Sequence, residues 1–168
     1  NIVFNDDFVF AVIGEGLGVE TLRKYNAKTG SLIWESKPGD EITKSSIRNL
    51  YLKGQYLYLI HFNGIVQFDI NSLTIYKEFV APNVNYPSDS YTGQHAVFID
   101  HNLFISFEEQ SNNSQQSYTQ ILRFDALDIG KKPEVIYEYT ANGDFIDYEV
   151  GYESLNSGFL PNGDTVLY

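Results

Sequence analysis

An acidic stretch near the end of the chain offers the residue types for binding a hard cation. Asp144, Asp147, Glu149 and Glu153 supply carboxylate oxygens, which are the ligands that Ca²⁺ prefers. The stretch lacks the D-x-D-x-D-G spacing that brings such oxygens together around one ion. A solvated acidic loop is therefore the preferred interpretation, with a Ca²⁺ site as the alternative.

The three histidines fit no zinc-binding spacing. His61, His95 and His101 are widely separated, and His101 falls in an expected turn. The chain has no cysteine, which removes disulfides and thiolate metal sites from consideration. We expect all three histidines to be structural or surface residues and assign no metal site.

The remaining patterns give no support for hydrolysis or nucleotide binding. The carboxylate pairs Asp6-Asp7 and Glu108-Glu109 are adjacent in sequence, and adjacent side chains on a strand face opposite ways. No serine lies in a G-x-S-x-G elbow. The glycine-rich segment 14–18 lacks the G-x-G-x-x-G spacing and precedes a strand-like segment, which favours a hairpin. We expect no catalytic residue and no cofactor.

Charge and hydropathy argue against nucleic-acid binding and against a membrane-spanning segment. The chain carries 11 basic and 22 acidic residues, a formal net charge of −11, which would repel a phosphate backbone. We expect no nucleic-acid partner and no small-molecule substrate. No apolar run reaches the roughly 18 residues that span a bilayer. The first residues do not resemble a signal peptide, and we expect the sequence to be a fragment of a longer protein.

The elements that would position any site are β-strands in a repeated arrangement. Four segments share one design, in which an apolar strand, a polar turn and an alternating apolar strand follow one another. Taking Phe8, Tyr56, Leu103 and Thr165 as equivalent, the steps are 48, 47 and 62 residues. The four strand pairs are 3–4 with 8–10, 50–52 with 56–58, 97–99 with 103–105, and 158–160 with 165–167.

Third and fourth strands follow in each of the first three units. Tyr25-Asn26, Phe68-Asp69 and Phe124-Asp125 stand at the same place before a polar turn. The predicted strands are 20–25 with 31–35, 64–69 with 73–79, and 119–125 with 135–139. No sustained 3.6-residue apolar period occurs, so we expect almost no helix. The polar connections 81–93 and 108–117 are expected to protrude as loops.

A period near 45 residues with four strands per unit is typical of a β-propeller. We therefore predict an all-β fold, a β-propeller arc of about three four-stranded blades plus the start of a fourth. The approximate blades are 1–36, 47–79, 95–140 and an incomplete 152–168. Because so few blades do not close a ring, we expect the arc to belong to a larger propeller.

One turn carries a family resemblance. Ala27-Lys28-Thr29-Gly30 with Trp34 resembles the repeat of quinoprotein-like (PQQ-repeat) propellers, in which an alanine, a Thr-Gly turn and a tryptophan recur. The match to this repeat is degenerate in the later units. The segment 68–72 keeps the spacing of the repeat but lacks its Gly and Trp, and the segment 124–128 keeps fewer of its features.

Within that superfamily, the order of features looks most like the lumenal propeller of the ER membrane protein complex subunit 1 family. The shared features are an opening strand pair, one clear blade from Leu22 to Trp34, divergent later blades and a Ser157-Gly158-Phe159 stretch. The resemblance implies a non-enzymatic scaffold on the lumenal side of the endoplasmic reticulum membrane, in a complex that inserts transmembrane proteins. It implies other subunits of that complex as partners, and membrane contact through parts of the parent protein outside this sequence.

Two alternatives stay open. A PQQ-dependent quinoprotein dehydrogenase would hold its cofactor with Ca²⁺ in the propeller axis, and many such enzymes stack it near a vicinal disulfide, which this cysteine-free chain lacks. A bacterial outer-membrane assembly propeller would be an eight-bladed soluble protein.

The residues assigned from the sequence are architectural. Gly30 is assigned to the blade turn, and the predicted packing residues between blades are Trp34, Leu32, Tyr56, Tyr58 and Phe104. Asn112 begins the one N-x-S/T acceptor and is a possible glycosylation site if the chain is lumenal.

Overall fold

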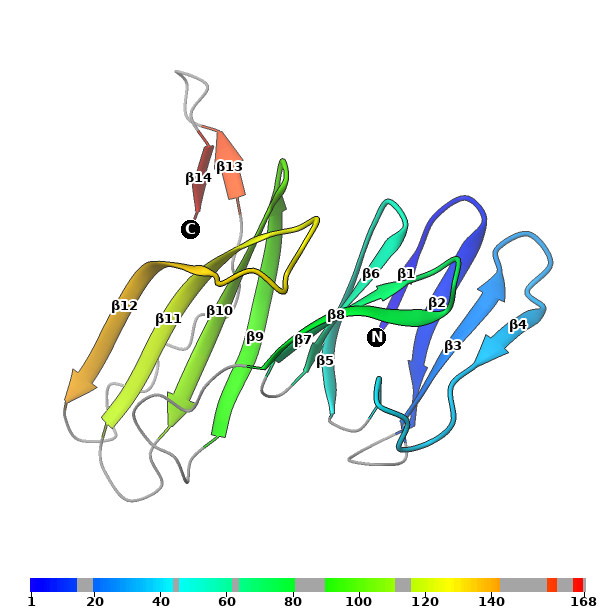
Figure 1. The fold of residues 1–168 in the computed structure, drawn as a ribbon, viewed down its shortest axis with the longest axis horizontal. Coiled ribbons are helices and arrows are strands. Elements are labelled where there is room, and N and C mark those ends of the chain that lie inside the picture. Colours follow the sequence, from blue (N-terminus) through cyan, green and yellow to red (C-terminus); the bar gives the residue numbers. More distant parts are fainter. Residues whose placement is uncertain are drawn as a thin grey trace. The chain divides into compact units, whose positions relative to one another are not determined.

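The computed structural model describes residues 1–14, 20–43, 46–61, 64–80, 90–110, 116–142, 157–159 and 165–167. Within these ranges every regular element is a β-strand, as the sequence predicted (Figure 1). The strands form three four-stranded antiparallel sheets and one hairpin, and within each sheet the strands that are consecutive in sequence pair with one another. This meander is the unit from which propeller blades are built.

The strands are grouped by sheet as follows. The first sheet contains β1 (Ile2–Phe4), β2 (Phe8–Ile13), β3 (Thr21–Asn26) and β4 (Leu32–Glu35). The second contains β5 (Ile47–Lys53), β6 (Tyr56–His61), β7 (Gly64–Asp69) and β8 (Thr74–Val80). The third contains β9 (Ser90–Ile99), β10 (Asn102–Gln110), β11 (Gln116–Asp125) and β12 (Glu134–Asn142), and the hairpin pairs β13 (Ser157–Phe159) with β14 (Thr165–Leu167).

The all-β fold class is confirmed, and so are the four strand pairs, but two expected loops are shorter than predicted. β9 already begins at Ser90, and the β10–β11 ladder extends to the pair Gln110–Ser117. Both segments are polar, and their polarity suggested loops. A ladder is held by backbone hydrogen bonds, so a polar hairpin can extend a sheet beyond its apolar core.

The turn after the third strand repeats in detail between the first two sheets. Asn26 Oδ1 accepts hydrogen bonds from the backbone N–H groups of Lys28 and Thr29, both at 2.9 Å. Asp69 Oδ1 accepts the corresponding bonds from Asn71 and Ser72, at 2.8 and 3.0 Å. Because Asn and Asp side chains can replace a backbone acceptor in this way, they fix both turns.

The residue four positions later has a positive φ in both turns. Gly30 has φ +70° and Leu73 has φ +59°. The backbone N–H of each donates at 2.9 Å to the carbonyl of the turn's first residue, Asn26 or Asp69. Glycine adopts this conformation without strain, whereas leucine does so against its preference.

Gly30→Ala is therefore expected to lower the free energy of unfolding by about 1–2 kcal/mol. An added Cβ would meet no atom within 4 Å, so the loss would come from the backbone angle and not from a clash. Chemical denaturation measures it, with Gly30→Asn as the control. Asparagine tolerates positive φ and should cost less; equal losses would contradict the backbone explanation.

The Asp69 turn should weaken in acid. The N–H of Ser72, followed by that of Asn71, lowers the pKa of Asp69 from its usual 3.8. Since the folded pKa lies below the unfolded one, this stabilisation is present above the unfolded pKa and is lost as pH falls through the folded pKa.

Asp69→Ala should accordingly cost about 0.5–1 kcal/mol at neutral pH, a small value because the carboxylate is exposed. The loss should shrink in unfolding curves recorded below the folded pKa. Asp69→Asn, which can keep the turn as Asn26 does, should show a flatter pH dependence than the wild type. A wild-type profile as flat as that of the Asn variant would rule out the charged contribution.

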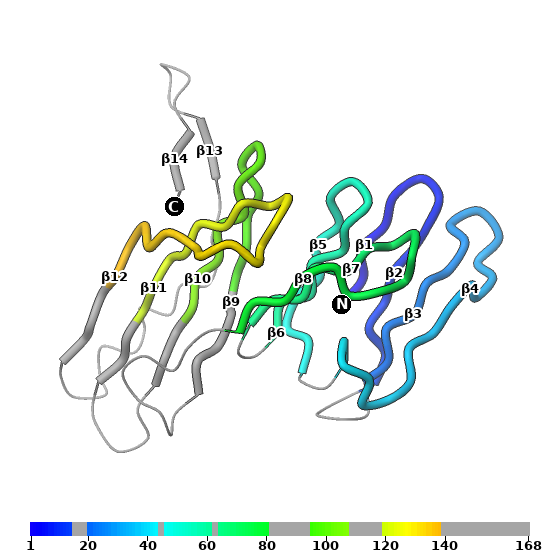
Figure 2. The backbone as a smooth tube through the Cα atoms, in the orientation of Figure 1, coloured from blue at the N-terminus to red at the C-terminus, as the bar shows by residue number. Residues whose placement is uncertain are grey.

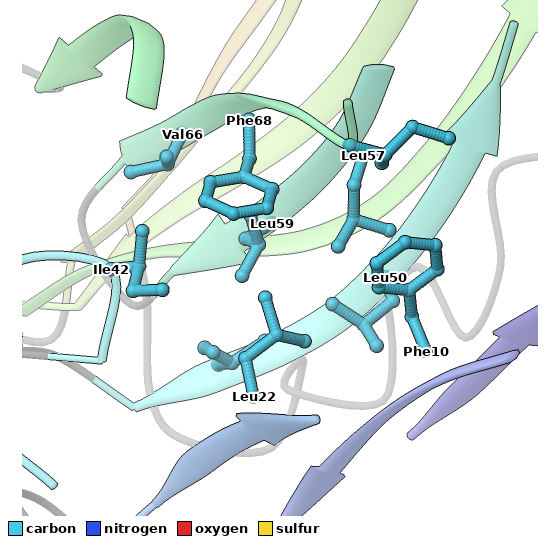
Figure 3. Packing of buried hydrophobic residues seen from close by; sticks show 10 residues of the cluster. Phe10, Leu22, Ile42, Leu50, Leu57, Leu59, Val66 and Phe68 are labelled. Carbon is cyan, nitrogen blue, oxygen red and sulfur yellow. The ribbon is translucent and has the colours of Figure 1, made fainter. Parts of the chain in front are cut away.

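The chain divides into two compact units, 1–79 and 80–168. In the first unit (blue to green in Figure 2), the first and second sheets share one core. Phe10 and Leu22 of the first sheet face Leu57, Leu59 and Phe68 of the second (Figure 3). All five side chains are almost fully buried. Burial of this apolar area holds the two sheets together.

In the second unit, the third sheet has its own buried side chains. Leu103, Ile105 and Phe107 on β10 are inaccessible to solvent, and Leu122 and Phe124 on β11 are nearly so. The alternation predicted for these strands places these residues inside.

Candidate functional site

The interface between the first two sheets is crossed by polar side chains that bind backbone atoms of the neighbouring sheet. Lys24 on β3 is buried, and its Nζ donates to the carbonyl of Ile70 at 2.8 Å. The same ammonium lies 3.8 Å from the centre of the Phe8 ring, a cation–π distance. Burial lowers the pKa of Lys24 from 10.5.

A buried carboxylate forms a second polar contact between the two sheets. Glu20 Oε2 accepts a hydrogen bond from the N–H of Ile47 at 2.9 Å, and Oε1 accepts one from Ser46 Oγ at 3.1 Å. Asn1 adds a third crossing, because its Nδ2 donates to the carbonyls of Ile47 at 3.2 Å and Arg48 at 2.9 Å. We call Asn1, Glu20 and Lys24 the polar bridge.

The sequence analysis did not identify the polar bridge. A signal was present for Lys24, since it stands two residues after Leu22 on an alternating strand and therefore shares the inward face of Leu22. A charged residue at an inward position must find a partner when it is buried. The same signal was present for Glu20, which stands two residues before Leu22 in the predicted strand 20–25, whereas Asn1 lies outside the predicted strands and gave none.

Trp34 lies at the same interface. Its ring is 5.6 Å from the ring of Phe68 on β7, at an interplanar angle of 34°, and it packs against the shared core. The contact joins the fourth strand of the first sheet to the third strand of the second. Such a contact restrains the angle between two sheets as well as burying area.

Leu32, which was predicted to pack between blades, does not pack into the core that the first two sheets share. In a regular strand Leu32 and Trp34 would share a face, but a bulge interrupts the β3–β4 ladder. Lys24 pairs with Trp34 while Tyr25 pairs with Leu32, so Ile33 is the extra residue. The bulge moves Leu32 to the face of Tyr25, where it is 51% exposed.

The other predicted packing residues lie within their own sheets. Tyr56 stacks on Tyr76 of β8, with ring centres 5.0 Å apart. Tyr58 is buried, and its hydroxyl oxygen accepts from Gln67 Nε2 at 3.4 Å. Phe104 is buried in the third sheet. Their contribution to packing between blades stays a prediction.

A groove of about 500 Å³ opens at the end of the first sheet, around the ion pair between Arg23 and Glu35. Arg23 Nε lies 2.6 Å from Glu35 Oε1. The hydrogen bond that Arg23 donates to Glu35, and then its hydrogen bond with Tyr25, raise the pKa of Arg23. Ser36, also on the groove, accepts from the N–H of Leu22 at 2.9 Å. Arg23 and Glu35 thus bind each other, and Ser36 binds the backbone of its own sheet.

The three histidines considered as metal ligands lie on different elements in the described residues. His61 is buried on β6, His95 is half-buried on β9 and His101 is exposed in a turn. Across the described ranges, no three His, Asp or Glu side chains gather as possible metal ligands.

Several predictions fall outside the described residues. These are the Asn112 acceptor, residues 15–18 of the glycine-rich segment and the acidic residues Asp144, Asp147, Glu149 and Glu153. Likewise, nothing is described of the side chains of Glu108 and Glu109.

Exposed apolar side chains recur on the fourth strand of each four-stranded sheet. They are Leu32 and Ile33 on β4, Tyr76 and Val80 on β8, and Val135, Ile136 and Tyr137 on β12. The described residues include no helix that is long and apolar enough to span a membrane.

Comparisons with known proteins agree with the fold without placing the chain in a family. No protein-family model and no curated protein matches the chain. It is similar to a protein of unknown function from Bacteroides caccae, at 14% identity with a TM-score of 0.54, over 96% of this chain and 50% of the other. At this identity the likeness shows the fold alone.

Two further solved structures resemble the chain more distantly. They are Hsv2 from Kluyveromyces lactis (9% identity, TM-score 0.46, covering 99% of this chain and 57% of the other) and the N-terminal domain of Nup159 (9% identity, TM-score 0.39, covering 94% and 48%). The chain thus spans about half the length of the structures it matches.

The sheets define the class of protein. Three successive four-stranded antiparallel meanders, followed by a further hairpin, have the strand arrangement of blades in an all-β propeller.

Proposed function

We propose that this chain is part of a non-enzymatic interaction propeller that scaffolds a membrane protein complex. The observation that carries the proposal is that each of the fourth strands β4, β8 and β12 exposes large apolar side chains. Exposed apolar surface on a rigid fold is characteristic of protein-binding sites. Sheets of a propeller hold such surfaces in fixed positions.

The polar bridge supports the same role. Its side chains form hydrogen bonds with backbone atoms of the second sheet and of the turn that follows β7. These bonds fix the position of one blade against the next. A scaffold needs this rigidity, because partners that bind different blades must keep a constant separation.

The finer proposal, a lumenal scaffold in the ER membrane protein complex, rests on the sequence resemblance of the Thr29-Gly30 turn and Trp34. It requires that the parent protein be held at the membrane by parts outside this sequence. A lumenal location would make Asn112 a possible glycosylation site.

Purification of the full-length parent from its native membrane tests the proposal. The tagged protein would be extracted in mild detergent, and co-purifying proteins would be quantified by mass spectrometry. We expect a set of membrane subunits in fixed stoichiometry. A lone soluble protein would contradict the proposal, and absorbance of a bound quinone would favour the dehydrogenase alternative.

A further inference from the structure

Strand β12 is an edge of the third sheet. Among the described strands it pairs only with β11, so one row of its backbone N–H and C=O groups faces away from the sheet (Figure 1). Such an edge is a template for an added strand unless the side chains along it prevent pairing.

The side chains of β12 differ from those of the other long fourth strand. On β8, exposed and half-buried residues alternate from Thr74 to Val80. On β12 all residues from Glu134 to Glu138 are exposed, including Val135 at 49%, Ile136 at 41% and Tyr137 at 41%. Three consecutive large apolar residues with no buried face are unusual on an isolated protein surface.

A bulge explains the loss of alternation. Tyr137 pairs with Ile121 and Val135 pairs with Leu122, which leaves Ile136 as the extra residue. A bulge can also protect an edge by twisting it away. Here it brings apolar groups to solvent on both sides of the strand.

Two carboxylates flank the apolar residues. Glu134 is ion-paired with Arg123, so its charge is already balanced. Glu138 accepts a hydrogen bond from the neutral amide of Gln120, at 3.5 Å. With a formal net charge of −11, the chain adds to the negative potential at this end of β12.

We propose that β12 binds an extended segment of a partner protein, which adds a strand to the third sheet. The segment places an apolar side chain against Tyr137 on one face of the sheet and a basic side chain beside Glu138 on the other face. This inference rests on the proposed interaction role and specifies the chemistry of one partner.

Charge argues against a second copy of this chain as the occupant. An antiparallel pair centred on Ile136 would set Glu138 of each copy opposite Glu134 of the other, so the pairing supplies no basic side chain for Glu138. Two copies would also bring together two net charges of −11.

A synthetic peptide tests the proposal on the full-length protein. The probe is a fluorescent eight-residue peptide of alternating valine and lysine, and its counterpart has glutamate in place of lysine. We expect only the basic peptide to bind, with affinity that falls as salt rises and with slower hydrogen exchange of the Glu134–Asn142 amides. Equal binding of the acidic peptide, or protection only outside β12, would overturn the proposal.

Three variants locate the site. Ile136→Lys and Glu138→Lys should each weaken binding of the basic peptide by about tenfold or more. Tyr76→Lys on β8, an exposed aromatic residue of comparable accessibility, is the matched control and should change it by less than about twofold. Unchanged binding in both β12 variants would overturn the assignment, as would self-association in sedimentation that Ile136→Lys abolishes. Unfolding curves confirm that each variant is folded.

The partner purification separates this inference from the proposed function. If the full set of subunits co-purifies with the wild type but the peptide does not bind β12, the inference fails and the scaffold role stands. If the parent purifies alone but the peptide binds β12 as described, the scaffold role fails and the edge remains a binding site.

Discussion

Trp34→Ala is expected to lower the free energy of unfolding by about 3 kcal/mol, the lower end of the range for truncating a packed aromatic side chain. The lower end applies because Trp34 is half-buried. The variant removes the contact with Phe68 and opens space beside the core shared by the first two sheets. Denaturant titration followed by circular dichroism measures the loss.

Leu32→Ala is the matched control for Trp34. Leu32 lies on the same short strand, but the bulge places it on the opposite, exposed face. Its truncation should cost no more than about 0.5 kcal/mol, as is usual for surface positions. Equal losses in the two variants would contradict the register described for β4.

Lys24→Met is expected to cost about 2 kcal/mol. The variant keeps a long apolar side chain but loses the charge-assisted hydrogen bond to Ile70 and the cation–π contact with Phe8. The carbonyl of Ile70 would lose this partner in a buried setting. Desolvation of the ammonium in the wild type offsets part of the gain, which is why the estimate stays modest.

The pH dependence of this loss has a definite sign. Burial lowers the pKa of Lys24 below 10.5, so between the folded and unfolded pKa values the unfolded chain holds more protons. The wild type should therefore become more stable relative to Lys24→Met as pH rises through that interval. A difference that shrinks with rising pH would mean that the ammonium is stabilised, and not penalised, in the folded protein.

Arg23→Met serves as the control for Lys24→Met. Arg23 is the neighbouring cation on β3, but it points to the opposite face and pairs with Glu35 at the surface. Exposed ion pairs contribute little, so this variant should be close to the wild type in stability. A loss as large as that of Lys24→Met would show that charge on β3, and not the polar bridge, matters.

The fold could be predicted because its signals are local. Alternation of apolar residues located the hairpins, and the Asn or Asp before each turn marked the end of every third strand. The side chains of Asn26 and Asp69 indeed hold their turns. Gly30 could be assigned for the same reason, since it has the positive φ that its turn requires.

The parts that could not be predicted depend on other strands. The bulge that turns Leu32 outward arises from pairing between β3 and β4. Alternation within β4 alone would place Leu32 on the same face as Trp34. The polar bridge depends on which backbone groups of the second sheet lie beside Glu20 and Lys24. The exposed edge of β12 likewise depends on the position of the strand in its sheet. The residues of β12 alone predict an ordinary apolar strand and do not indicate that it lies at an edge.

The most direct test of the scaffold account is a cryo-electron microscopy map of the full-length protein in the assembly that purifies with it. The account predicts a propeller of four-stranded blades with partner subunits contacting the exposed fourth strands. A propeller without any partner, and with a quinone in its axis, would contradict it.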